Sequence, residues 1–172
     1  MKTTRAKPLP NKLYKLLRIA VDDAEKLDSD PRFNLAMGTW ISKIDDGPCN
    51  VCLAGAVMVC ELNALKNKEF RRTLEDNGNA ALSPHDVTTS RKVAEKLEAI
   101  DDMRAGRIRA AAYTVLGKRS AANRFFKELS SAEHLVLGLA ESAITDNYMS
   151  DIGRAPWEDY RVAADLLEML DL

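Results

Sequence analysis

The sequence predicts an all-α protein, a compact single-domain helical bundle of about six to eight helices. Three observations favour this class. Apolar residues recur at helical spacing along most of the chain, Ser-Pro and Ala-Pro steps mark helix starts, and no internal repeat or low-complexity linker divides the 172 residues. With 46% hydrophobic and 30% charged residues, a chain of this length can bury the core of one domain.

The N-terminal part is expected to be an arm followed by a helix. Residues 1–10 carry two prolines and no periodicity, so we expect a flexible basic arm, with residues 11–172 as the single helical domain. Leucines and alanines recur at helical spacing from Leu13 to Leu27, and Asp30-Pro31 ends the pattern. Within 33–45 the apolar residues alternate in part, so an irregular segment and a short β element both fit.

Residues 47–62, GPCNVCLAGAVMVCEL, are apolar over most of their length. The preceding turn and Pro48 read as a helix start, so we expect 49–65 to form the central buried helix. Its Ala54-Gly55-Ala56 step would give a flat face against which a tryptophan or another helix can pack closely.

The rest of the chain is expected to be helical. The expected helices in chain order are 68–75, 83–103, two short helices parted by Gly117, one that begins at Ser130-Ser131, and a last one that begins at Ala155-Pro156-Trp157.

All three cysteines lie in 47–62, and Cys49 and Cys52 form a C-x-x-C. On one helix the three thiols would share a side, and free cysteine packs as a small hydrophobe, so a buried core is one interpretation. A reactive thiol pair at Cys49 and Cys52 is another, because a position in the first turn of a helix lowers a thiol pKa. The βαβ context of a thioredoxin-like site is missing, and one C-x-x-C with two distant histidines does not supply the paired ligands of a structural zinc site.

No catalytic residue, cofactor or metal ligand is predicted. The phosphate-loop, nucleophile-elbow, zinc-protease and dinucleotide-binding motifs do not occur. His85-Asp86 is expected to act at a helix start, and the Asp22-Asp23 and Asp101-Asp102 pairs are expected on the solvated surface.

Charge is unevenly distributed although the net charge is −1. Residues 103–127 hold seven basic residues and no acid, whereas 128–172 hold ten acids against two arginines. The basic segment fits a nucleic-acid contact, and it equally fits basic helices that face the acidic C-terminal helices, within one chain or across a homodimer. The candidate macromolecule-binding residues are Arg104, Arg107, Arg109, Lys118, Arg119 and Arg124.

Trp40, a turn with Asp46-Gly47, and Cys52-Leu53-Ala54-Gly55-Ala56 follow one another in the chain. This order resembles small phage and bacterial accessory proteins with a Trp…Cys-Leu-x-Gly-Ala helix pattern. The resemblance covers about 20 residues. It implies a compact accessory protein of a bacterium, phage or prophage, and it implies no reaction.

We therefore expect a non-enzymatic accessory or regulatory protein that binds another macromolecule, with a protein partner favoured and self-association included. The alternatives are a nucleic-acid-binding protein that uses 103–127, and a thiol- or metal-dependent enzyme at Cys49 and Cys52. The N-terminal MKTTRAKPLPNK is not followed by the apolar run of a signal peptide, and the longest apolar run, about ten residues, is too short to span a bilayer. A cytoplasmic location without membrane contact is expected.

Overall fold

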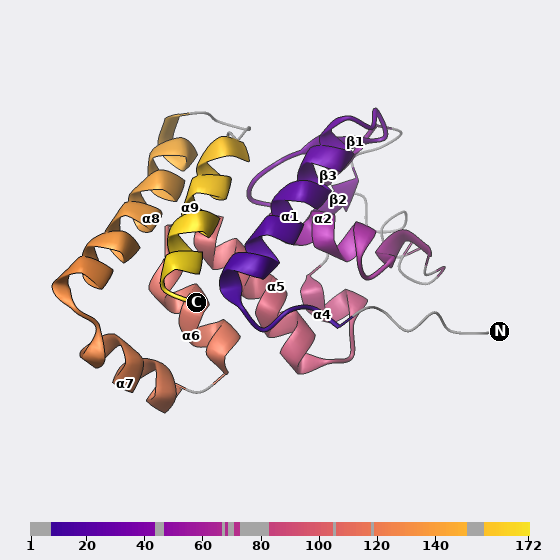
Figure 1. Cartoon of the computed structure of the whole chain (residues 1–172). Helices are drawn as coiled ribbons and strands as arrows, with labels where there is room; N and C mark the ends of the chain where they lie inside the picture. The colour runs from indigo at the N-terminus through magenta and orange to yellow at the C-terminus, as the bar shows by residue number, and fades with distance from the viewer. Residues whose placement is uncertain are drawn as a thin grey trace.

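Helices dominate the computed structural model of the chain, and a small sheet lies at one side of them (Figure 1). The structure describes residues 8–43, 47–66, 68, 71–72, 83–104, 106–117, 119–150 and 157–172, except for the side chains at 104, 119 and 145–150. The elements in chain order are α1 (Leu13–Asp28), β1 (Phe33–Leu35), β2 (Ile41–Lys43), β3 (Cys49–Val51), α2 (Leu53–Cys60), a 3-10 helix η1 (Ala64–Lys66), α4 (Pro84–Val87), α5 (Arg91–Arg104), α6 (Ile108–Leu116), α7 (Arg119–Glu128), α8 (Ser131–Ser150) and α9 (Trp157–Met169). The all-α prediction is confirmed, with eight α-helices in the described residues. Of the two alternatives left open for 33–45, the β element is the one found, as β1 and β2.

Helix α1 connects the two sides of the molecule. It packs against α2 and β1 on one side and along α9 on the other (Figure 1). The buried residues of α1 repeat at helical spacing, as the sequence predicts, and they are Leu13, Tyr14, Leu16, Leu17, Ala20, Val21, Asp23, Ala24 and Leu27. The predicted arm is shorter than 1–10, because Leu9 is buried in the core and its carbonyl oxygen accepts a hydrogen bond from Lys96 Nζ at 3.0 Å. Residues 1–7 lie outside the described part.

The sheet has three short strands in the order β1-β3-β2. Strand β3 is parallel to β1, with Cys49 opposite Phe33, and antiparallel to β2, with Asn50 opposite Ser42. The prediction of one helix over 49–65 is therefore wrong. Residues 49–51 form the central strand, and the helix runs only from Leu53 to Cys60, with Cys52 as its N-cap.

The small-residue face of α2 meets the backbone next to β2. A Cβ atom added at Gly55 would lie 1.7 Å from the carbonyl oxygen of Trp40. The Cys52 N–H donates a hydrogen bond to the same oxygen at 3.3 Å. The expected close packing at Ala54-Gly55-Ala56 is confirmed, and the surface that packs there is the main chain of Trp40.

The helix starts and stops in the second half follow the sequence with one exception. Ser83 caps α4 together with Asp86, Gly117 ends α6 with φ 65°, and Ser130 caps the start of α8. The predicted helix at 83–103 is two helices, because Thr88 is extended (φ −138°, ψ 138°) and α5 begins at Arg91. The predicted helix at 68–75 lies mostly outside the described residues.

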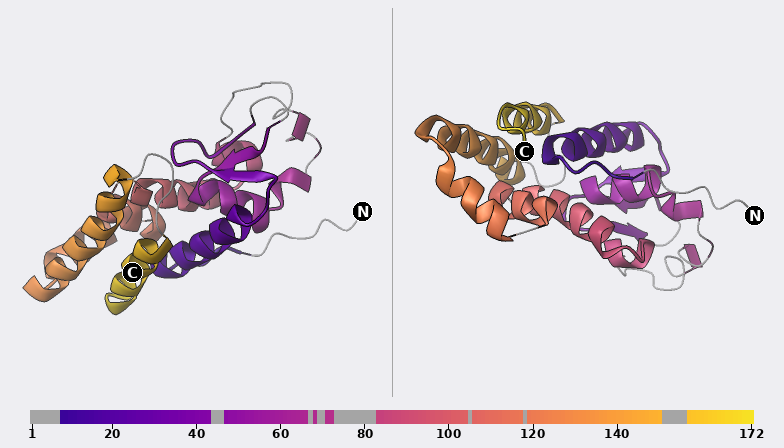
Figure 2. Two further views of the ribbon diagram at one scale, coloured as in Figure 1. Left: turned by 90° about the horizontal axis from the view of Figure 1, so that it is seen from above. Right: turned by 60° about the horizontal axis from the view of Figure 1, so that its bottom comes forward.

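Helices α8 and α9 pack side by side, and α7 packs on α6. Both views in Figure 2 place α7 and α8 at the end of the molecule away from the sheet. The core is therefore continuous from the sheet through α1 to α9, while α7 and α8 form its outer end.

Candidate interaction surface

The C-x-x-C cysteines lie in the core. Cys49 is on the central strand β3 and Cys52 is the N-cap of α2, and both side chains are buried. Burial raises the pKa of the Cys49 thiol to about 11. The expected position of Cys49 in a helix first turn, which would have lowered its pKa, is not realised because the residue is in a strand.

Asp23 is a buried carboxyl that the sequence reading placed on the solvated surface. Its side chain is 8% exposed, at the contact of α1 with the end of α2. Its pKa is raised to about 6, first by burial and next by the negative charge of Glu61, while a hydrogen bond with the Cys60 thiol opposes the rise. The Oδ2 atom of Asp23 has no hydrogen-bond partner among the described residues. The sequence did carry a signal, since Asp23 falls in the buried stripe with Leu16, Ala20 and Leu27.

Within the described part of the chain, no three side chains of His, Cys, Asp or Glu lie together in a way that could hold a metal ion.

Of the basic residues predicted for macromolecule binding, one forms an ion pair within the chain and two are exposed without one in the described residues. Arg109 on α6 forms an ion pair with Glu141 on α8, with its Nη1 atom 2.8 and 2.7 Å from the two carboxylate oxygens. Arg107 and Arg124 are exposed and form no ion pair with a described residue. Lys118 and the side chains of Arg104 and Arg119 lie outside the described part.

The aromatic residues of the basic segment attach α7 to α6. Tyr113 and Phe126 pack edge to face with ring centroids 5.1 Å apart, and Phe125 packs on Phe126 at 5.4 Å. The Tyr113 hydroxyl donates a hydrogen bond to Asn123 at 2.8 Å. These rings are half-buried against one another, which leaves little of their faces for stacking on nucleic-acid bases.

Exposed apolar side chains gather on α8 and α9. Among the described residues five large apolar side chains are exposed, and four of them lie on these two helices. These four, which we call the outer apolar residues, are Leu135 (64% exposed), Leu139 (51%), Val162 (44%) and Met169 (72%). Leu135 and Leu139 are one helical turn apart, and Val162 and Met169 are two turns apart, so each pair occupies one face of its helix.

The opposite faces of the same helices are buried in the core. They carry Leu137, Ala140 and Ile144 on α8, and Tyr160, Ala163, Ala164 and Leu167 on α9. Helix α8 is therefore apolar on its inner and its outer side, which is typical of a helix that packs on both sides.

Two acids near the end of α9, and one that follows it, are paired with basic residues near the N-terminus. Arg18 of α1 forms ion pairs with Asp165 and Glu168, each at 2.6 Å, and Lys12 pairs with Asp171 at 2.6 Å. Arg161 bonds back to Asp22 and Glu25 of α1. The charge segregation in the sequence is thus used in part for contacts between α1 and α9, and it does not leave α9 strongly acidic.

Comparisons with known proteins assign no relative: no family model matches the chain, and neither a curated protein nor a solved structure is similar to it. None of the helices in the described ranges has the length and apolar character needed to cross a membrane.

Proposed function

We propose that this is a non-enzymatic binding protein that associates with another protein through the outer apolar residues of α8 and α9, and that the occupant of this surface is a second copy of the chain. The observation that supports the proposal is the exposure of Leu135, Leu139 and Met169, each more than half exposed, on helices that are otherwise packed in the core. Leu135 and Leu139 are neighbours on one helix face, and exposed apolar patches are typical of protein interfaces.

Burial of the outer apolar residues is the driving force that self-association would use. Full burial of a leucine or methionine side chain contributes roughly 1.5–3 kcal/mol, and a two-fold axis uses each residue twice, once from each copy. This gain has to exceed the free energy that is lost with translational and rotational entropy on association. The burial of several side chains together is large enough for that. A net charge of −1 produces little repulsion between copies.

Sedimentation equilibrium over a range of protein concentrations tests the proposal. We expect the average mass of the unmodified chain to rise with concentration, and the double variant Leu135→Glu, Leu139→Glu to stay monomeric, because an interface would bury the new carboxylates. The matched control is His134→Glu, an exposed position on the same helix that is turned by about 100° from Leu135 and so lies off the outer face. A monomeric mass for the unmodified chain at every concentration would exclude a second copy as the occupant.

A second candidate function is nucleic-acid binding through the basic segment. It is supported by Arg107 and Arg124, which are exposed and unpaired within the described residues. Binding to duplex DNA or RNA through these residues would weaken steeply with salt, and Arg107→Gln together with Arg124→Gln would make the log-log slope shallower by about 2. A slope near zero for the unmodified chain would remove this candidate.

A further inference from the structure

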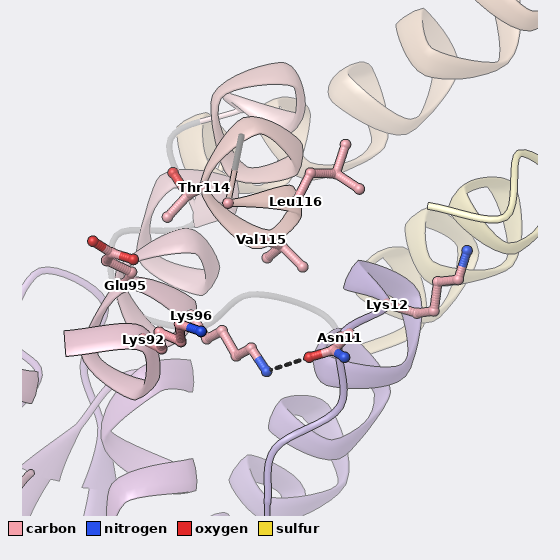
Figure 3. Close-up of a pocket in the computed structure, with 9 residues that line it drawn as sticks. Asn11, Lys12, Lys92, Glu95, Lys96, Thr114, Val115 and Leu116 are labelled. Carbon is pink, nitrogen blue, oxygen red and sulfur yellow. Dashed lines mark hydrogen bonds between the residues drawn. The ribbon is translucent and has the colours of Figure 1, made fainter. Parts of the chain in front are cut away.

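A cavity of about 440 Å³ lies between the start of α1, the helix α5 and the end of α6 (Figure 3). This volume is within the range of small-molecule sites. The cavity is separate from the outer apolar residues, since it is lined by residues of 11–12, 92–96 and 114–117.

Two lysines of α5 give the cavity its charge. Lys92 and Lys96 are one helical turn apart and both line it. Lys96 Nζ is held in place by the carbonyl oxygen of Leu9 at 3.0 Å and the side-chain oxygen of Asn11 at 2.8 Å, as Figure 3 shows for Asn11. Lys92 is exposed and has no ion-pair partner among the described residues.

The other charged groups of the lining do not neutralise this pair. Glu95 forms an ion pair with Arg91 at 2.7 Å. Lys12 extends away from Lys92 and Lys96 and donates to a carboxylate oxygen of Asp171 at 2.6 Å (Figure 3). Burial and the nearby charge of Lys92 lower the pKa of Lys96, as expected for two cations placed close together.

The opposite wall of the cavity is formed by the end of α6 and is apolar. Val115 is half-buried, and Leu116, at 41% exposed, is the fifth large apolar side chain exposed in the described residues. A ligand that fills the cavity therefore meets ammonium groups on one side and aliphatic carbon on the other.

We propose that this cavity binds a small organic phosphate, with the phosphate dianion at Lys92 and Lys96 and its apolar group against Val115 and Leu116. Two ammonium groups match the charge of a phosphate monoester, and lysine binds phosphate as a point charge with three donors. The proposal does not depend on the function proposed for α8 and α9, because it uses none of their residues.

Titration of the full chain with phenyl phosphate, followed by calorimetry and by NMR chemical shifts, tests this. We expect saturable binding with shifts at the Lys92, Lys96 and Val115 amides, weaker binding of inorganic phosphate and of benzoate, and no binding of neutral benzyl alcohol. Lys92→Gln is expected to lower the affinity for phenyl phosphate roughly tenfold, whereas Lys92→Arg retains it. The matched control Lys127→Gln, an exposed lysine on α7, leaves it unchanged.

The apolar wall has its own test. Leu116→Ala is expected to weaken phenyl phosphate but not inorganic phosphate, because only the ester carries a group that contacts Leu116. The proposal is overturned if phenyl phosphate gives no saturable shift up to about 10 mM. It is also overturned if benzyl alcohol binds equally well, or if Lys92→Gln binds phenyl phosphate as tightly as the unmodified chain does.

Discussion

Helices α2 and α8 are both rich in apolar residues, yet they are packed in different ways. Every residue of α2 from Leu53 to Met58 is buried, with the sheet and α1 around it. Helix α8 buries Leu137, Ala140 and Ile144 but leaves Leu135 and Leu139 exposed. An apolar composition therefore predicts a helix that can pack on several sides. Whether other parts of the same chain cover each of those sides depends on the tertiary fold. In α8 one side stays exposed.

The strongest test of this comparison is a pair of glycine substitutions. Gly55→Ala places a Cβ 1.7 Å from the Trp40 carbonyl oxygen, so the backbone must move, and we expect the free energy of unfolding to fall by about 3–5 kcal/mol. In Gly138→Ala, within α8, the added Cβ has no neighbour within 4 Å, and we expect a gain of about 0.5–1 kcal/mol. Urea unfolding measures both. Equal effects at the two positions would contradict the difference in packing.

A second pair of substitutions compares the inner and the outer face of α8. Leu137→Ala removes a fully buried side chain, and we expect it to cost about 2–5 kcal/mol of unfolding free energy. Leu135→Ala, on the outer face, should change it by less than about 0.5 kcal/mol when both are measured at protein concentrations low enough to hold the chain monomeric. A large loss for Leu135→Ala in the monomer would mean that this residue packs within its own chain.

A smaller effect is expected at the buried Asp23. Its pKa in the folded state is about 6, above the value of 3.8 for an unperturbed aspartate, so the folded state holds the proton more tightly than the unfolded state. The stabilisation that arises from this difference in pKa is therefore fully present below pH 4, and it is lost as the pH rises from about 4 to 6. We expect Asp23→Asn to remove this loss and to stabilise the protein at pH 7 by on the order of 1–2 kcal/mol relative to the unmodified chain.

The measurement is the difference in unfolding free energy between Asp23→Asn and the unmodified chain at several pH values. Glu128→Gln, at an exposed carboxyl of α7 far along the chain from Asp23, is the control. A difference that does not change between pH 4 and pH 7 would show that Asp23 titrates as a solvated carboxyl.

Local signals predicted much of the fold. The apolar spacing of α1, the capping serines Ser83 and Ser130, and the stop at Gly117 depend on neighbouring residues, and each is found where the sequence places it. The break before α5 is not predicted, although Thr88-Thr89-Ser90 favours one. Their hydroxyl groups compete with the backbone for helical hydrogen bonds. In the structure the Ser90 N–H donates to the Thr88 hydroxyl at 3.1 Å.

Non-local contacts explain what the sequence could not predict. Residues 49–51 form a strand because Phe33 and Lys43 lie on either side of Cys49, and an apolar run alone fits a buried strand and a buried helix equally. The outer apolar residues could not be predicted from the sequence for the same reason. Because α8 carries apolar residues on two opposite sides, its sequence does not reveal that Leu137 is inside and Leu135 outside. The lysine cavity likewise joins the start of α1 to α5 and α6 across the fold.

The central claim is that the chain associates through α8 and α9 while the sheet, α1 and α2 serve as its packed core. An NMR dilution series of the full chain, with backbone amide shifts followed from high to low concentration, tests it most directly. The account predicts concentration-dependent shifts at Leu135, Leu139, Val162 and Met169 and their neighbours, and constant shifts in α2 and the sheet. Shifts centred on α2 and the sheet, or none at any concentration, would contradict it.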